Sequence, residues 1–198
     1  MKLTTGRIVL IAIIGAVLGG AVGLWTNAPN PLLRTEPGQR ALQAALSATA
    51  PPAPEGLAIA RRGEPVPRLQ LPDLDQHPVE VPAAWAGRPL LVNFWATWCG
   101  PCIEEMPELD RFASTQAEGG VQVVGIALDD ADAVRDFLTR IPVGYPILLD
   151  QAGPADSSVQ FGNLRGVLPY SVLISTDGRL LKQKVGPFQH GEIDGWSE

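Results

Sequence analysis

The chain has 198 residues, a formal net charge of −6 and only two cysteines and two histidines. No cluster of basic residues occurs in its globular part, which excludes the usual electrostatic basis of nucleic-acid binding. The two histidines stand alone, without the spacing that zinc ligands require. We therefore expect no metal site and no nucleic-acid partner.

The first segment is apolar. Residues 8–25 carry no charge, and two basic residues lie before them. As a helix this stretch would be about 27 Å long, close to the roughly 30 Å hydrocarbon core of a bilayer. We predict that residues 1–25 form an N-terminal transmembrane helix with the N-terminus in the cytoplasm, contacting the lipid bilayer through residues 8–25. A cleaved signal peptide is the alternative, but its apolar region is usually shorter, and Pro29 would hinder cleavage.

Residues 26–56 contain six prolines among alanines and polar residues. This composition is typical of a spacer that holds a domain away from the membrane. A short helix over 39–48 is expected within it. Residues 57–198 are then enough for one domain with its own core.

Within this domain, apolar runs and turn residues predict an α/β fold. Strands are expected at 66–71, 79–81, 90–95, 121–128, 145–149, 170–175 and 179–185. Helices are expected from Pro101 onward and after Asp129 and Asp130, the candidate caps, and any closing helix after Val185 must be short. Right-handed crossovers make the central strands parallel, and Asp177-Gly178 turns an antiparallel hairpin. The prediction is a mixed sheet with helices on both faces.

Cys99 and Cys102 are the most informative residues. They follow the buried strand expected at 90–95, and Pro101 is typical of the first turn of a helix. Unpaired N–H groups and the helix dipole would stabilise a Cys99 thiolate at that position. Cys99 is therefore the expected nucleophile and Cys102 the thiol that resolves the mixed disulfide. A static disulfide and half of a zinc site remain as alternatives.

Residues 94–102 resemble the active site of the thioredoxin superfamily. Pro107 matches the proline of the active-site helix, and the Leu168-Pro169 step resembles the family's cis-proline segment. Asn93 replaces an acidic residue of thioredoxin itself. Together with the additional unit at 121–150, this departure indicates similarity to the membrane-tethered TlpA/ResA-like branch.

The resemblance implies roles for further residues. In that branch an acidic residue on the active-site helix tunes the cysteines, and Glu105 holds the matching place, on the same helix face as Cys102. The neighbouring Glu104 is expected to be a solvated acid. The residues expected to line the groove for a partner protein are Trp98, Gly100, Pro101, Leu168 and Pro169.

The function implied is that of an extracytoplasmic thiol-disulfide oxidoreductase without a cofactor. The Gly-Pro pair between Cys99 and Cys102 resembles that of reducing members, so disulfides in partner proteins would be reduced, in cytochrome c or copper-site maturation. An oxidising compartment requires a membrane electron donor of the DsbD or CcdA type. The chain would sit in the cell inner membrane as a single-pass protein, with its catalytic domain facing the periplasm.

Two other functions remain open. A redoxin-type thiol peroxidase would share the fold, and residues 63–67 resemble the entry to both groups. A copper(I)-binding module could use the paired thiolates, although no methionine lies close to the motif apart from Met106.

Overall fold

A computed structural model describes residues 31–197, and the chain divides into two units, Met1–Ala41 and Leu42–Glu198. No helix within the described part of the chain is long and apolar enough to cross a membrane. The transmembrane helix predicted at 8–25 lies outside the described residues. The 3-10 helix η1 spans Pro31–Arg34, and α2 spans Glu36–Ala48, which includes the helix expected at 39–48.

The elements of the second unit follow the predicted order. The strands are β1 (Leu69–Pro72), β2 (Pro78–Val81), β3 (Leu90–Trp95), β4 (Gln122–Leu128), β5 (Ile147–Asp150), β6 (Tyr170–Ile174) and β7 (Leu180–Val185). The helices are η2 (Ala83–Trp85), α3 (Gly100–Thr115), α4 (Ala131–Arg140), α5 (Ser157–Gln160) and α6 (Glu192–Trp196). All seven expected strands are present, with the first one shifted toward its C-terminal end.

The main sheet has the strand order β5-β4-β3-β6-β7. Strands β3, β4 and β5 are parallel, whereas β6 is antiparallel to β3 and β7 is antiparallel to β6. This confirms the mixed sheet and its closing hairpin. Strands β1 and β2 form a separate antiparallel hairpin.

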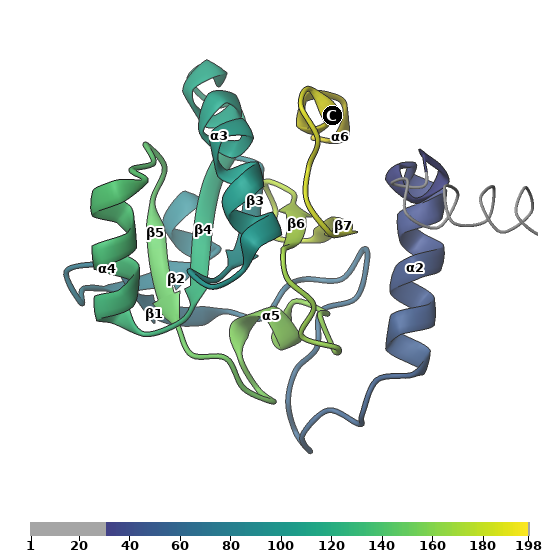
Figure 1. The fold of residues 1–198 in the computed structure, drawn as a ribbon. Coiled ribbons are helices and arrows are strands. Elements are labelled where there is room, and N and C mark those ends of the chain that lie inside the picture. Colours follow the sequence, from purple (N-terminus) through teal and green to yellow (C-terminus); the bar gives the residue numbers. More distant parts are fainter. Residues whose placement is uncertain (1–30, 198) are drawn as a thin grey trace, which may run out of the picture. The chain divides into compact units, whose positions relative to one another are not determined.

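Helices flank this sheet unequally. The steps from β3 to β4 and from β4 to β5 run in the same direction, so two right-handed crossovers place α3 and α4 on the same face (Figure 1). Apolar residues of α3, α4 and α6 share one core cluster. The opposite face is covered by the β1-β2 hairpin and by the one-turn helix α5. Phe161, the C-cap residue of α5, packs on Phe94 of β3, with their ring centroids 5.7 Å apart. The sequence interpretation foresaw helices on both faces but not this asymmetry.

The central strand β3 is buried along its whole length. Leu91 and Trp95 pack on the side of α3, while Val92 and Phe94 pack on the side of the hairpin. A strand covered on both faces has an almost continuous apolar sequence, which explains why this one is easy to recognise. Asn93 is its single polar residue, and it faces α3.

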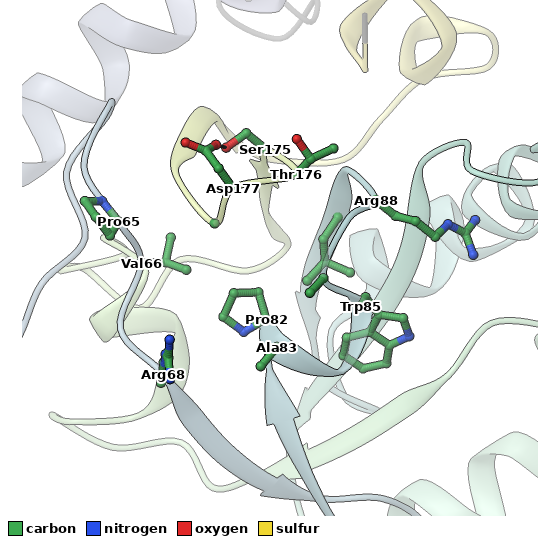
Figure 2. Close-up of a pocket in the computed structure, with 13 residues that line it drawn as sticks. Pro65, Val66, Arg68, Pro82, Ala83, Trp85, Arg88, Ser175, Thr176 and Asp177 are labelled. Atoms are coloured by element: carbon green, nitrogen blue, oxygen red, sulfur yellow. Dashed lines mark hydrogen bonds between the residues drawn. The ribbon is translucent and has the colours of Figure 1, made fainter.

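A hollow of about 260 Å³ lies at the amino-terminal end of β3 (Figure 2). Trp85, Pro82 and Leu90 contribute apolar surface to it, and Arg68 and Asp177 contribute charge. The cysteines follow the carboxyl end of the same strand. This hollow is therefore at the other end of β3 from the disulfide.

We expect Gly125→Ala to lower the free energy of unfolding by about 1–3 kcal/mol, because the core around it is full. Gly125 lies opposite Asn93 in β4, and a Cβ there would lie 2.7 Å from Ile147 Cδ1 and 3.1 Å from Trp95 Nε1. Denaturant unfolding measures the loss. Gly153→Ala is the control, since its Cβ would meet nothing closer than 4.0 Å. Equal stability of the two variants would contradict the packing argument.

Candidate active site

The two cysteines form a disulfide at the start of α3, with their Cα atoms 5.3 Å apart. Cys99 is the N-cap residue of the helix, and its Sγ accepts a hydrogen bond from the Cys102 backbone N–H at 3.3 Å. Cys99 is 5% exposed and Cys102 is fully buried. The helix N-terminus thus provides a backbone donor to the Cys99 sulfur, as the position of Pro101 in the first turn indicated.

The surface beside Cys99 is apolar and open. The side chain of Trp98 is 68% exposed, which is unusual for a large aromatic residue. Gly100 and Pro101 are also exposed, so these three residues surround the disulfide on the solvent side. Such an arrangement can contact another protein without moving the core.

The Leu168–Pro169 peptide bond is cis, as the resemblance implied. Pro169 is buried, and Leu168 is half-buried against the core cluster that contains both cysteines. A backbone hydrogen bond holds this segment in place, because the N–H of Gly186 donates to the carbonyl of Pro169 at 2.9 Å. A second cis bond, Val81–Pro82, was not predicted.

The loop that leads into α3 is attached to the end of β4. Asp129 Oδ2 accepts hydrogen bonds from Thr97 N at 2.9 Å and from Thr97 Oγ1 at 2.6 Å. Partial burial opposes ionisation, but these bonds outweigh it and hold the pKa of Asp129 below its usual value. Of the two candidate caps of α4, only Asp130 caps the helix. Asp129 instead positions the residues just before Cys99.

Glu105 is buried inside the protein, whereas Glu104 is exposed, as the helical spacing from Cys102 predicted. Glu105 Oε1 accepts a hydrogen bond from Asn93 Nδ2 at 2.7 Å, and Glu105 Oε2 accepts one from the Phe188 backbone N–H at 2.7 Å. Burial raises the pKa of Glu105 to about 7, although both bonds and the charge of Lys184 act in the opposite direction. The carboxyl group is therefore able to change protonation near neutral pH.

Sequence reasoning missed Glu108, one turn further along α3. It is 8% exposed and accepts hydrogen bonds from the Gly191 backbone N–H at 2.7 Å and from Arg111 Nη2 at 2.7 Å. The guanidinium of Arg111 is the main reason why the pKa of Glu108 falls to about 2. His190 contacts the same carboxylate at 3.0 Å and is otherwise exposed. The spacing of Glu105 and Glu108 is the only sequence signal of this pair.

Lys184 on β7 is a second residue that the sequence did not identify. It is buried, with its Nζ 2.7 Å from Glu192 Oε1 and 5.1 Å from the centroid of the Phe188 ring. Lys184 thus fixes the segment after β7 to β7 itself, whereas Glu108 fixes it to α3. A hollow of about 510 Å³ opens between this segment and α3, and Glu105 contributes to its lining.

One trio of side chains in the described part of the chain could supply three metal-ligand atoms. Asp73, Asp75 and His77 place such atoms within 4.8 Å of one another in the turn between β1 and β2. Asp73 Oδ1 already accepts the backbone N–H groups of Asp75 and His77, each at 2.8 Å. These bonds explain the cluster, and His77 is exposed in the turn.

Comparison with known proteins gives a consistent result. The family model described as Redoxin matches residues 61–195. A thiol-disulfide oxidoreductase ResA of Bacillus anthracis is 28% identical over 135 residues, covering 68% of this chain and 75% of that protein. One from Bacillus cereus (strain ATCC 10987 / NRS 248) is 30% identical over 125 residues, covering 63% and 69%.

Solved structures agree with these relatives. A thioredoxin-related protein from Neisseria meningitidis serogroup B is 34% identical with a TM-score of 0.56, covering 63% of this chain and 93% of that one. A putative thiol:disulfide interchange protein DsbE from Chlorobium tepidum is 26% identical with a TM-score of 0.59, covering 69% and 94%. The thioredoxin-like fold is therefore established by similarity as well as by topology.

The buried carboxyl of Glu105 predicts a pH dependence of stability. Its pKa of about 7 in the folded protein exceeds the usual 4.5, so the folded state binds the proton more tightly. The corresponding stabilisation is complete below pH 4.5 and is lost as the pH rises through 7, by about 3.5 kcal/mol at roughly 1.4 kcal/mol per unit. We expect Glu105→Gln to remove this loss, measured as denaturant unfolding of the oxidised protein at pH 5 and pH 8.

Glu104→Gln is the matched control, because Glu104 is the exposed neighbour on the same helix. It should leave the pH profile of the wild type unchanged. Parallel profiles for Glu105→Gln and the wild type would show that burial of Glu105 does not raise its pKa.

Proposed function

We propose that this chain, which belongs to the Redoxin family and is a thiol-disulfide oxidoreductase, reduces disulfides in partner proteins on the outer side of the inner membrane. The observation that supports this most directly is the Cys99–Cys102 pair at the N-terminus of α3, one turn before the buried carboxyl of Glu105.

In the proposed reaction, Cys99 acts as the nucleophile. Its thiolate attacks one sulfur of the partner's disulfide, which forms a mixed disulfide and releases the first partner thiolate. The Cys102 thiolate then attacks Cys99 Sγ and releases the second. The partner gains two electrons and two protons, and the protein is left with the Cys99–Cys102 disulfide observed here.

We assign Glu105 the role of proton carrier for Cys102. Cys102 is fully buried and must lose its proton before it can attack, so a nearby base is required. Glu105 lies three residues later on the same helix, and its pKa of about 7 allows it to take up and return a proton at neutral pH.

The partner segment would dock beside the disulfide. Exposed Trp98 offers aromatic surface, and Gly100 and Pro101 leave the approach to Cys99 open. The half-buried Leu168 and the cis Pro169 form the other side of the proposed groove. These five residues support docking of an extended chain beside Cys99.

The proposed location rests on the sequence of the N-terminal segment. An uncharged stretch at 8–25 with basic residues before it would anchor the chain with its domain in the periplasm. That compartment does not keep thiols reduced, so an electron donor of the DsbD or CcdA type would regenerate Cys99 and Cys102. Apocytochrome c and copper-site assembly proteins are the proposed substrates.

We expect the two cysteines to behave differently once reduced. In the full-length protein, iodoacetamide should label Cys99 first, because Cys99 borders the exposed Trp98 and Cys102 is enclosed. A Cys102→Ser variant should accumulate mixed disulfides with a disulfide-bonded model protein, and Cys99→Ser should not. Peptide mapping measures both outcomes. Faster labelling of Cys102, or capture through Cys102, would reverse the assigned roles.

Peroxide consumption at rates above that of disulfide reduction would favour the peroxidase alternative.

The proposed topology predicts the accessibility of Cys99 in intact cells. After reduction, a membrane-impermeant maleimide should label Cys99, and the protein should remain with the membranes during a carbonate wash. A shortened soluble form that begins near Pro29 would show that residues 8–25 are a signal peptide. Protection of Cys99 in intact cells would contradict the periplasmic location and the proposed electron supply.

A further inference from the structure

The hydrogen bonds around Glu105 fit only one of its protonation states. Each carboxylate oxygen faces an N–H donor, Asn93 Nδ2 on one side and the Phe188 backbone on the other, both at 2.7 Å. A neutral carboxylic acid carries a proton on one oxygen, and this O–H needs an acceptor, which neither N–H donor supplies. If the new O–H is to be hydrogen-bonded by these two partners, one of them must change from donor to acceptor.

Asn93 can change from donor to acceptor without any movement of the backbone. Its Nδ2 donates both to Glu105 and to Ser171 Oγ at 3.0 Å, while its Oδ1 is buried without a hydrogen-bond partner in the described part of the chain. Rotation of the amide by half a turn exchanges Nδ2 and Oδ1, which have nearly the same size. Oδ1 would then accept hydrogen bonds from a protonated Glu105 and from the Ser171 hydroxyl.

The number of hydrogen bonds is the same in the two arrangements. Asn93 makes two bonds before the rotation, with Oδ1 unpaired, and two bonds after it, with the amide N–H groups unpaired. Ser171 is suited to this exchange because a hydroxyl both accepts and donates. An unpaired buried polar atom is normally costly, so its presence beside an ionisable group needs a reason.

The bond to Phe188 offers no such exchange, because a backbone N–H cannot accept. Release of this segment would also strain the bonds that hold Gly191 to Glu108 and Asp194 to Arg111. Rotation of Asn93 disturbs none of them.

The charged groups around Glu105 do not provide this exchange, and no hydrogen bond joins Glu105 to the hydroxyl of Tyr145, which is buried without a partner in the described part of the chain. Lys184 on β7 attracts the carboxylate, Glu192 on α6 repels it, and Tyr145 before β5 is itself influenced by its charge. On α3 the nearby titratable groups are Cys102, whose thiol exists only in the reduced protein, and Glu108, which is paired with Arg111. From β3, Glu105 meets the neutral Asn93, which in turn contacts Ser171 of β6.

We propose that Asn93, supported by Ser171, is a positioning residue whose side-chain amide rotates when Glu105 gains or loses a proton. The inference rests on the proposed role of Glu105 as proton carrier for Cys102. Asn93 makes the same number of hydrogen bonds in both protonation states of Glu105. The proton can therefore be stored and returned without displacement of α3 or of the segment after β7.

The direct test is a pH titration of the full-length, isotope-labelled protein by NMR. The side-chain amide of Asn93 should shift with the same midpoint as the Glu105 carboxyl carbon. The Phe188 and Gly191 amide protons should keep their protection from exchange throughout. Loss of protection at Phe188, with an unchanged Asn93 side chain, would show that the segment is released instead and would overturn the proposal.

Asn93→Leu provides a second test, because it removes both hydrogen-bonding modes at similar volume. If Asn93 serves both states, its loss should move the Glu105 midpoint by less than about half a pH unit. If it serves only the carboxylate, the midpoint should rise by about one to two units. Ser171→Ala should reduce the shift of the Asn93 side-chain amide during the Glu105 titration. This variant replaces Asn93→Leu as the second test if Asn93→Leu does not fold.

Asn163 and Ser158 form a matched control pair. Asn163 is 3% exposed, and its Nδ2 donates to Ser158 Oγ at 3.2 Å, but both ends of its amide are hydrogen-bonded. Asn163→Leu should destabilise the fold and leave the Glu105 midpoint unchanged. A rise of about one unit or more in Asn93→Leu, with no shift in Asn163→Leu, would show that Asn93 serves the carboxylate alone and would contradict the proposal.

The proposed function can fail separately. If Glu105→Gln leaves the pH profile of disulfide exchange unchanged, Glu105 is not the proton carrier. If that profile changes while the Asn93 amide stays fixed, only the rotation is wrong.

Discussion

The buried carboxyl group of Glu105 is the contact on which the active-site region depends. It joins three parts of the fold that are distant in sequence: helix α3, strand β3 through Asn93, and the chain after β7 through Phe188. A buried carboxylate is costly unless it is hydrogen-bonded, so these contacts must form together. The position of the cysteines on α3 is therefore coupled to the central strand and to the C-terminal segment.

The C-terminal segment shows why such contacts are needed. Helix α6 has five residues, which is far too few for a helix that is stable on its own. It is held by Glu108 and Arg111 of α3 and by the edge-on contact of Phe188 with Trp196, whose ring centroids are 5.2 Å apart. Polar bonds from one face of α3 thus replace the packing area of a longer closing helix.

Glu105 and Glu108 lie one turn apart, yet their pKa values move in opposite directions. Glu108 has a guanidinium partner and stays ionised down to a pH of about 2, so it contributes stability above pH 4.5 that is lost in acid. Glu105 has only neutral donors in contact, and burial therefore dominates. One acid of α3 maintains structure, and the other is available for proton transfer.

Local patterns in the sequence were sufficient for much of this site. The apolar run of β3, the helix start after Cys99 and the choice of Glu105 over Glu104 all depend on spacing within a few residues. The cis bond before Pro169 required the family resemblance. The roles of Glu108 and Lys184 could not be predicted, because Gly191, which Glu108 holds, lies more than 80 residues away and burial of Lys184 depends on the position of the segment after β7.

The asymmetric layers had a different cause. Two right-handed crossovers in the same direction imply one shared face for α3 and α4, but the direction of each step cannot be read from apolar runs.

The expectation that Asp129 caps α4 was wrong for a similar reason. An acid before a helix is a reasonable cap, and only the alignment of β4 beside β3 brings Thr97 close enough to compete for it.

The identity of residue 93 follows from the placement of the acid on α3. Asn93 stands where thioredoxin has an acidic residue, and its Nδ2 lies 2.7 Å from Glu105 Oε1. A carboxylate at 93 would face a second carboxylate at this distance, and two like charges in a buried site cannot both ionise. Once the acid lies one turn after Cys102, the strand position must therefore be neutral and still able to hydrogen-bond. Asparagine meets both conditions, and the proton site then stays in fixed register with the resolving cysteine on a single rigid helix.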